Sequence, residues 1–104
     1  MFNHMVKHSS QPIDRTFAAL SHPVRREILT RLSRHDMYVT QLAAHFTISL
    51  PGVSKHIGQL EKAGLVTRHV IGRDHLIQLA PNNLADAADW LAAFEDFWPP
   101  RGQR

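Results

Sequence analysis

Residues 39–64, VTQLAAHFTISLPGVSKHIGQLEKAG, carry two apolar stripes with helical spacing, separated by a short break. The first stripe consists of Val39, Leu42, Ala43 and Phe46, and the second of Val53, Ile57 and Leu60. Apolar residues that recur at three- and four-residue intervals indicate amphipathic helices. Two such helices joined by a tight turn predict a helix–turn–helix.

The boundaries of the second helix are also marked in the sequence. Thr47 and Ile48 form the break. Ser49 is a good N-cap residue, and Pro51 fits the first turn, where its missing N–H is not needed. Gly64 is typical of the left-handed position that ends a helix. We therefore expect a helix over residues 49–63.

One face of this helix carries the residues that suggest a function. At 100° per residue the three apolar side chains cluster on one side, and the other side combines small residues with amide, hydroxyl and ammonium groups. Gly58, in mid-helix, costs about 0.5–1 kcal/mol relative to alanine, and solubility alone does not explain it. Small residues would let the helix enter the major groove of DNA, where Gln and Lys recognise bases or phosphates. The alternative is a merely solvated face.

The flanking segments predict two more helices before this pair, and a hairpin and a helix after it. We expect helices over residues 13–20 and 23–33, antiparallel strands over residues 66–71 and 75–79 joined by a turn at 72–74, and a last helix over residues 84–97 with an Asn cap. The predicted fold is mainly α with a two-stranded β-hairpin, in the order α-α-α-α-β-β-α. Because an isolated hairpin is marginally stable, it needs the helices to pack against, as in a winged helix–turn–helix.

Length and composition limit the remaining possibilities. The 104 residues suffice for one domain, which we place at residues 13–98 between a flexible arm (1–12) and a tail (99–104). The chain has no cysteine, which excludes disulfides, thiolate metal sites and cysteine nucleophiles. It has no apolar run near the ~20 residues that cross a bilayer and no signal-peptide pattern. We therefore expect a soluble, cytoplasmic protein without a membrane partner.

Charge is distributed unevenly along the chain. The net charge is +3, but residues 1–83 carry ten basic and five acidic residues, whereas residues 84–98 carry four acidic and no basic residues. A basic body with an acidic C-terminal segment favours an anionic partner for the body. Arg68 and Arg73, with Lys62 nearby, would place cations where a wing reaches DNA; the alternative is an ordinary solvated turn. Arg25, Arg26 and Arg31 could clamp the DNA backbone or form salt bridges with the acidic segment.

Residues 17–81, FAALSHPVRREILTRLSRHDMYVTQLAAHFTISLPGVSKHIGQLEKAGLVTRHVIGRDHLIQLAP, closely resemble the ArsR-type winged-helix transcriptional repressors. The resemblance rests on three segments in this order: ALSHPVRREIL, SLPGVSKHIGQLEKAGLV and RHVIGRDHLIQL. It implies a homodimer that binds double-stranded DNA at a palindromic promoter operator and represses transcription.

The resemblance also implies which residues act. Together with Arg68, the predicted DNA contacts are Ser49, Pro51, Gly52, Ser54, Lys55, His56, Gln59 and Arg73. The predicted dimer interface, formed by the first and last helices, comprises Phe17, Leu20, Leu84, Ala87, Trp90, Leu91 and Phe94. Packing within the monomer is the alternative for these apolar residues, and an interhelix contact is the alternative for His56.

Three positions depart from the family pattern. Thr47 replaces a common turn glycine, Asp74 a commonly basic residue and His22 a common acidic cap.

Metal sensing is not expected, because there is no cysteine for a thiolate site and no histidine in the last helix. We expect no metal and no cofactor, and no motif specifies an effector.

The chain has eight histidines, and their protonation would strengthen phosphate attraction and make DNA binding pH-dependent. Catalysis has little support, because neighbouring pairs such as Ser21-His22 do not face each other on a helix; we expect no enzyme. The rival function is a winged-helix protein-interaction module that docks a partner through its acidic last helix and binds DNA weakly or not at all.

Overall fold

The structure, a computed structural model, describes residues 11–98. Its helices and strands follow the predicted order, with α2 (Pro12–Leu20), α3 (Pro23–Leu32), α4 (Val39–Ala43), α5 (Leu50–Lys62) and α6 (Asn82–Ala92), and with β2 (Val66–Ile71) and β3 (Asp74–Leu79) forming the hairpin. Most of the predicted arm and all of the predicted tail lie outside the described residues. The winged helix–turn–helix fold is confirmed.

The sheet has a third strand that the sequence analysis missed. β1 (Met37–Tyr38) pairs antiparallel with β3, which places Met37 opposite Ile77 and gives the order β1-β3-β2. The hairpin is therefore anchored at its base by a strand that precedes α4. A side-chain hydrogen bond of 2.7 Å from Gln78 Nε2 to Asp36 Oδ2 ties β3 to the residue before β1.

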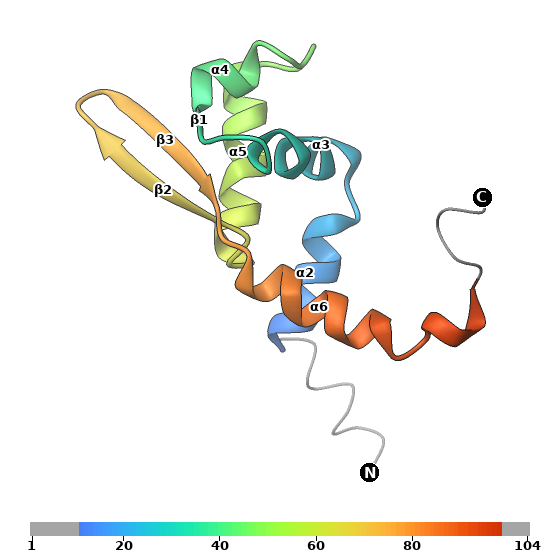
Figure 1. Cartoon of the computed structure of the whole chain (residues 1–104). Helices are drawn as coiled ribbons and strands as arrows, with labels where there is room; N and C mark the ends of the chain where they lie inside the picture. Colours follow the sequence, from blue (N-terminus) through green and yellow to red (C-terminus); the bar gives the residue numbers. More distant parts are fainter. Residues whose placement is uncertain (1–10, 99–104) are drawn as a thin grey trace.

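The core lies where α3, α4 and α5 meet the base of the sheet. Its fully buried apolar side chains are Ile28, Leu42, Val53, Ile57, Leu60, Leu65 and Ile77. The three residues from α5 are the predicted stripe, so the orientation of this helix is fixed by burial. The hairpin projects from the body beside α5, whereas α2 and α6 lie side by side at the other end of the molecule (Figure 1).

The end of α5 confirms one prediction and corrects another. Gly64 has φ +73°, the left-handed conformation expected after a helix. Asn83, however, does not cap α6. Its side chain donates a 3.0 Å hydrogen bond to the Ala63 carbonyl, which satisfies a free acceptor at the end of α5 and joins α5 to α6.

The last helix is shorter than predicted. α6 ends at Ala92, and a single 3₁₀ turn, η1 (Glu95–Phe97), follows. Ala93 and Phe94 donate to carbonyls three residues back, at 3.3 and 3.0 Å. These shorter-range bonds tighten the last turn of the helix.

Candidate nucleic-acid interface

Helix α5 is positioned by its cap and by its buried stripe. Ser49 Oγ accepts a 3.2 Å hydrogen bond from the Gly52 N–H, which confirms the predicted N-cap. Burial of Val53, Ile57 and Leu60 then directs the opposite side of the helix away from the core. The face predicted to bind DNA is therefore on the outside.

The predicted contacts on this face differ in exposure. Lys55 and Gln59 are exposed and lie one turn apart, so their side chains share a face. Ser49 and Pro51 are also exposed, whereas Gly52 and Ser54 are half-buried. A Cβ added to Gly58 would meet nothing within 4 Å. No packing within the described fold therefore requires glycine at position 58.

His56 faces the neighbouring helix. Its ring centroid lies 4.3 Å from that of His22, and its Nδ1 lies 3.2 Å from Arg25 Nη1. Partial burial, followed by the charges of His22, Arg25 and Lys55, lowers the pKa of His56 below its ordinary value. The structure thus shows the interhelix contact for His56, and its role as a DNA contact stays a prediction.

The residues at the start of α3 bind the end of α2. His22 accepts the Val24 N–H through Nδ1 at 3.1 Å and so caps α3 where an acidic residue is common. Arg25 donates to the carbonyl oxygens of Ala19 and Ala18 at 2.7 and 3.3 Å, and Arg26 donates to that of Leu20 at 2.7 Å.

These contacts correct one predicted alternative. Arg31 pairs with Glu27 within α3, N–O 2.9 Å, and the guanidinium groups of Arg25 and Arg26 bind carbonyl oxygens of α2. Within residues 11–98, none of these arginines forms a salt bridge with the acidic segment. The binding of Arg25 and Arg26 to carbonyl oxygens at the end of α2 was not predicted from the sequence.

The two wing arginines have different environments. Arg68 lies in β2; its Nε contacts Glu61 Oε1 at 3.2 Å, and its Nη1 lies 3.1 Å from His75 Nδ1. Arg73 is exposed beside Gly72, whose φ is +64°. In the described part of the chain Arg73 has no hydrogen bond or ion pair. The sequence could not separate these two roles, because both residues are cations of one hairpin.

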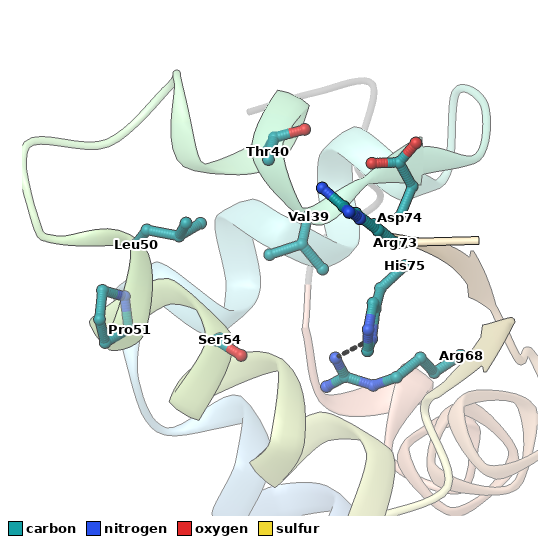
Figure 2. A pocket seen from close by; sticks show the side chains of 9 residues that line it. All are labelled: Val39, Thr40, Leu50, Pro51, Ser54, Arg68, Arg73, Asp74 and His75. Atoms are coloured by element: carbon teal, nitrogen blue, oxygen red, sulfur yellow. Dashed lines mark hydrogen bonds between the residues drawn. The ribbon is translucent and has the colours of Figure 1, made fainter. Parts of the chain in front are cut away.

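A cavity of about 330 Å³ lies between α5 and the wing (Figure 2). Val39 and Thr40 of α4, and Leu50, Pro51 and Ser54 of α5, line one side. The wing contributes Arg68, Arg73, Asp74 and His75. The cavity therefore has an apolar wall and a mainly cationic wall.

The α2–α6 end of the molecule carries an exposed aromatic surface. The rings of Phe17 and Trp90 meet edge-on at 5.9 Å between centroids, and those of Trp90 and Phe94 lie 4.9 Å apart. Phe17, Trp90, Leu91 and Phe94 are nevertheless 36–52% exposed.

Other predicted interface residues lie further in. Ala87 is buried, and Leu20 and Leu84 pack against the core. For these three residues the structure shows packing within the monomer, the alternative given for the predicted interface. We use the name aromatic face for Phe17, Trp90, Leu91 and Phe94.

Within residues 11–98, no three histidine, aspartate or glutamate side chains converge in a way that could hold a metal ion. None of the helices in these residues has the length and apolar character needed to cross a lipid bilayer.

Comparison with known proteins matches this geometry to a family. A helix-turn-helix domain model matches residues 20–69. The transcriptional repressor SdpR of Bacillus subtilis is 34% identical over 82 residues, which cover 79% of this chain and 91% of SdpR. The chain belongs to the ArsR family of winged helix–turn–helix transcriptional regulators.

Solved structures of ArsR regulators agree with this assignment. The ArsR family transcriptional regulator RHA00566 is 34% identical, with a TM-score of 0.78 and coverage of 88% of this chain and 100% of that one. An ArsR-like transcriptional regulator from Rhodococcus sp. RHA1 is 32% identical, with a TM-score of 0.70 and coverage of 84% and 82%. The winged helix, with its α2 and α6 flanks, is therefore shared with ArsR regulators.

Proposed function

We propose that this ArsR regulator is a homodimeric repressor that inserts α5 into the major groove of a palindromic promoter operator. The observation that carries the proposal is the orientation of α5. Its buried stripe directs Lys55, Gln59 and Gly58 outward together. An exposed helix face with small, amide and ammonium groups fits the groove and the edges of the bases.

Individual residues have distinct roles in this proposal. Lys55 and Gln59 contact bases, with Ser54 and His56 beside them, and Ser49, Pro51 and Gly52 bring the start of the helix to the DNA backbone. Arg73 contacts phosphate from the wing tip, because its guanidinium is exposed and unpaired among residues 11–98. Arg68 reaches the DNA beside it and also holds the wing through Glu61 and His75.

The dimer forms through the aromatic face. Large apolar side chains that stay exposed in a monomer mark an association surface, and a two-fold axis there presents two copies of α5 to two half-sites. Occupying the operator blocks polymerase and so represses transcription. We expect this activity in the cytoplasm, in the compartment that holds the promoter.

Fluorescence anisotropy tests the proposal. The purified protein is titrated against the duplex upstream of its own gene and against a scrambled duplex, at about 150 mM salt because phosphate contacts are salt-dependent. We expect a preference of roughly a thousandfold or more for the cognate duplex. Lys55→Ala and Gln59→Ala should each cost about 1–3 kcal/mol of that binding. Arg34→Gln removes an exposed charge outside the proposed interface and should leave the preference intact.

Two outcomes would contradict the proposal. Equal, weak binding to both duplexes, after fragments of the whole upstream region have been tried, would favour the protein-interaction module instead. Unchanged affinity in Lys55→Ala or Gln59→Ala would remove that residue from the set of base contacts.

A further inference from the structure

We propose that the cavity between α5 and the wing binds a small organic carboxylate with an apolar body, and that this ligand releases the protein from DNA. The second half of the statement rests on the proposed function. The first half concerns the chain alone.

The cavity has the size and the walls of a ligand site. Its volume of about 330 Å³ lies at the lower end of the range for small-molecule pockets, which are mostly apolar with a few polar groups that orient the ligand. Figure 2 shows Leu50 and Val39 extending toward the space from one side and the Arg68 side chain extending toward it from the other. A ligand that fits both walls needs an apolar body and a polar end.

Charge indicates that the polar end is an anion. Among the lining side chains two are arginines and one is an aspartate, and Glu61, which contacts Arg68 Nε, does not line the cavity. The groups that the wing turns toward the space are therefore mainly cationic. Arg68 is held in place by Glu61 and His75 through its Nε and Nη1, which leaves Nη2 for a ligand. A fixed guanidinium that is already oriented loses little entropy when it binds a planar carboxylate.

Exposed apolar residues indicate that the ligand has an apolar part in addition to its anionic group. Leu50 lines the cavity and is 47% exposed, although it lies at the start of α5, where a DNA-backbone contact alone would favour a polar side chain. Val39 adds a second apolar surface beside it. An inorganic phosphate, or the phosphate of a DNA backbone, would leave this wall exposed to water.

The location explains how such a ligand would act. One wall belongs to α5 and the other to the wing, the two elements proposed to contact the operator. A carboxylate there occupies Arg68 Nη2 and places negative charge beside the incoming phosphates. Binding of ligand and binding of DNA therefore oppose each other, and each lowers the affinity for the other by the same factor.

The first experiment measures ligand binding without DNA. 2-Naphthoate, which is fluorescent, is titrated with the full chain and followed by its own anisotropy, beside the uncharged 2-naphthamide and with inorganic phosphate as competitor. We expect 2-naphthoate to bind at least about tenfold more tightly than the amide, because charge-assisted hydrogen bonds are the stronger ones. Phosphate at equal concentration should not displace it.

Matched variants locate the site. Leu50→Asn should weaken 2-naphthoate binding by about tenfold, since it removes part of the apolar wall. Ile48→Asn is the control, because Ile48 is 40% exposed, lies two residues earlier and does not line the cavity. Arg68→Gln should also weaken binding, and circular dichroism checks that each variant is folded.

The outcomes separate this proposal from the proposed function. No saturable binding of 2-naphthoate, equal binding of the amide, displacement by phosphate, or equal losses in Leu50→Asn and Ile48→Asn would each overturn the ligand site. If the site binds 2-naphthoate but the protein never prefers its upstream duplex, the ligand site stands and the proposed operator binding fails. If both hold, 2-naphthoate should reduce operator affinity in the wild type, and in Leu50→Asn it should do so only at about tenfold higher concentration.

Discussion

Arg25 Nη1 lies 3.2 Å from His56 Nδ1, a contact that joins α3 to the helix proposed to enter DNA. The same guanidinium donates to the carbonyl oxygens of Ala19 and Ala18 at the end of α2. One side chain therefore connects α2, which carries part of the aromatic face, with α5. Arginine suits this role because its several N–H donors are held in one rigid plane.

Replacing Arg25 tests this connection. Arg25→Gln should lower the free energy of unfolding by about 1–2 kcal/mol, because it leaves carbonyl and imidazole acceptors without their donor. Operator affinity should also fall, since α5 loses a contact that orients it. Urea denaturation and fluorescence anisotropy on the same preparation measure both.

Arg26→Gln is the matched control for this prediction. Arg26 donates to the Leu20 carbonyl and so also binds the end of α2, and the variant loses the same charge. It should lose stability and keep more of its operator affinity than Arg25→Gln does. Equal affinity losses in the two variants would show that charge, rather than the contact with His56, matters for binding.

The lowered pKa of His56 predicts an acid-sensitive fold. The unfolded imidazole titrates near 6.5, whereas in the folded chain burial and the neighbouring His22, Arg25 and Lys55 disfavour its protonation. Below about pH 6.5 the unfolded state binds a proton that the folded state does not, so the free energy of unfolding falls as the pH decreases. Above that pH the contribution is fully present.

Urea denaturation at about pH 7.5 and pH 5.5 checks this, on either side of the ordinary histidine pKa. His56→Gln keeps an acceptor for Arg25 and cannot titrate, so its stability should fall less between these pH values than that of the wild type. Equal falls would assign the acid sensitivity to other groups. The lowered pKa also means that His56 contributes less than an ordinary histidine to the predicted strengthening of DNA binding in acid, because its protonation is disfavoured.

Sequence patterns predicted the elements whose signals are local. The cap at Ser49, the left-handed Gly64 and the buried stripe of α5 all depend on residues within a few positions of one another, and each is confirmed. The two-residue strand β1 is too short to show a period, and its pairing of Met37 with Ile77 spans the whole helix–turn–helix. Such pairing depends on tertiary contact rather than on local preference.

The same distinction applies to the candidate site. The outward face of α5 followed from helical periodicity, which needs only the sequence. The contact between Arg25 and His56, and the difference between Arg68 and Arg73, depend on side-chain partners brought together by the fold. The hydrogen bond from the Asn83 amide to the Ala63 carbonyl likewise depends on how α6 packs against α5. None of these partners has a signature in the sequence.

The two wing arginines should respond differently to substitution. Arg73→Ala should leave the free energy of unfolding unchanged, weaken binding to every duplex by a similar factor and reduce the slope of log affinity against log salt by about 1. Arg68→Ala should also lower stability, by less than about 1 kcal/mol because its partner Glu61 is 41% exposed and the pair is screened by water. A salt titration of both variants measures the slopes. A preserved slope in Arg73→Ala would mean that the wing tip does not contact phosphate.

Disrupting the aromatic face should separate the dimer. Trp90 is 52% exposed and lies at the centre of the ring cluster, so Trp90→Glu would place a charge in the interface. We expect a monomer in sedimentation velocity and a loss of operator affinity of about a hundredfold or more, because each half-site is then bound separately.

Val70→Glu is the control for this experiment. Val70 is a more exposed apolar residue, at 63%, and lies on the wing, so the added charge should leave the dimer intact. A monomeric wild type at micromolar concentration, or a dimeric Trp90→Glu, would contradict the proposed interface.

Substitution of Gly58 tests whether the outer face of α5 binds DNA or is merely solvated. A Cβ at this position meets nothing within 4 Å, so Gly58→Ala should raise the free energy of unfolding by about 0.5–1 kcal/mol through helix propensity alone. Gly72→Ala is the contrast, because a Cβ there also meets nothing but φ is +64°, and the variant should lose stability. Urea denaturation distinguishes the two.

Operator affinity should change in the opposite direction to stability in Gly58→Ala. If α5 lies against the base edges at Gly58, the added methyl group keeps the helix from its closest approach, and operator affinity falls while stability rises. Fluorescence anisotropy with the cognate and scrambled duplexes measures the loss, which should be confined to the cognate duplex. A more stable Gly58→Ala with unchanged operator affinity would mean that this face of α5 is solvated in the complex.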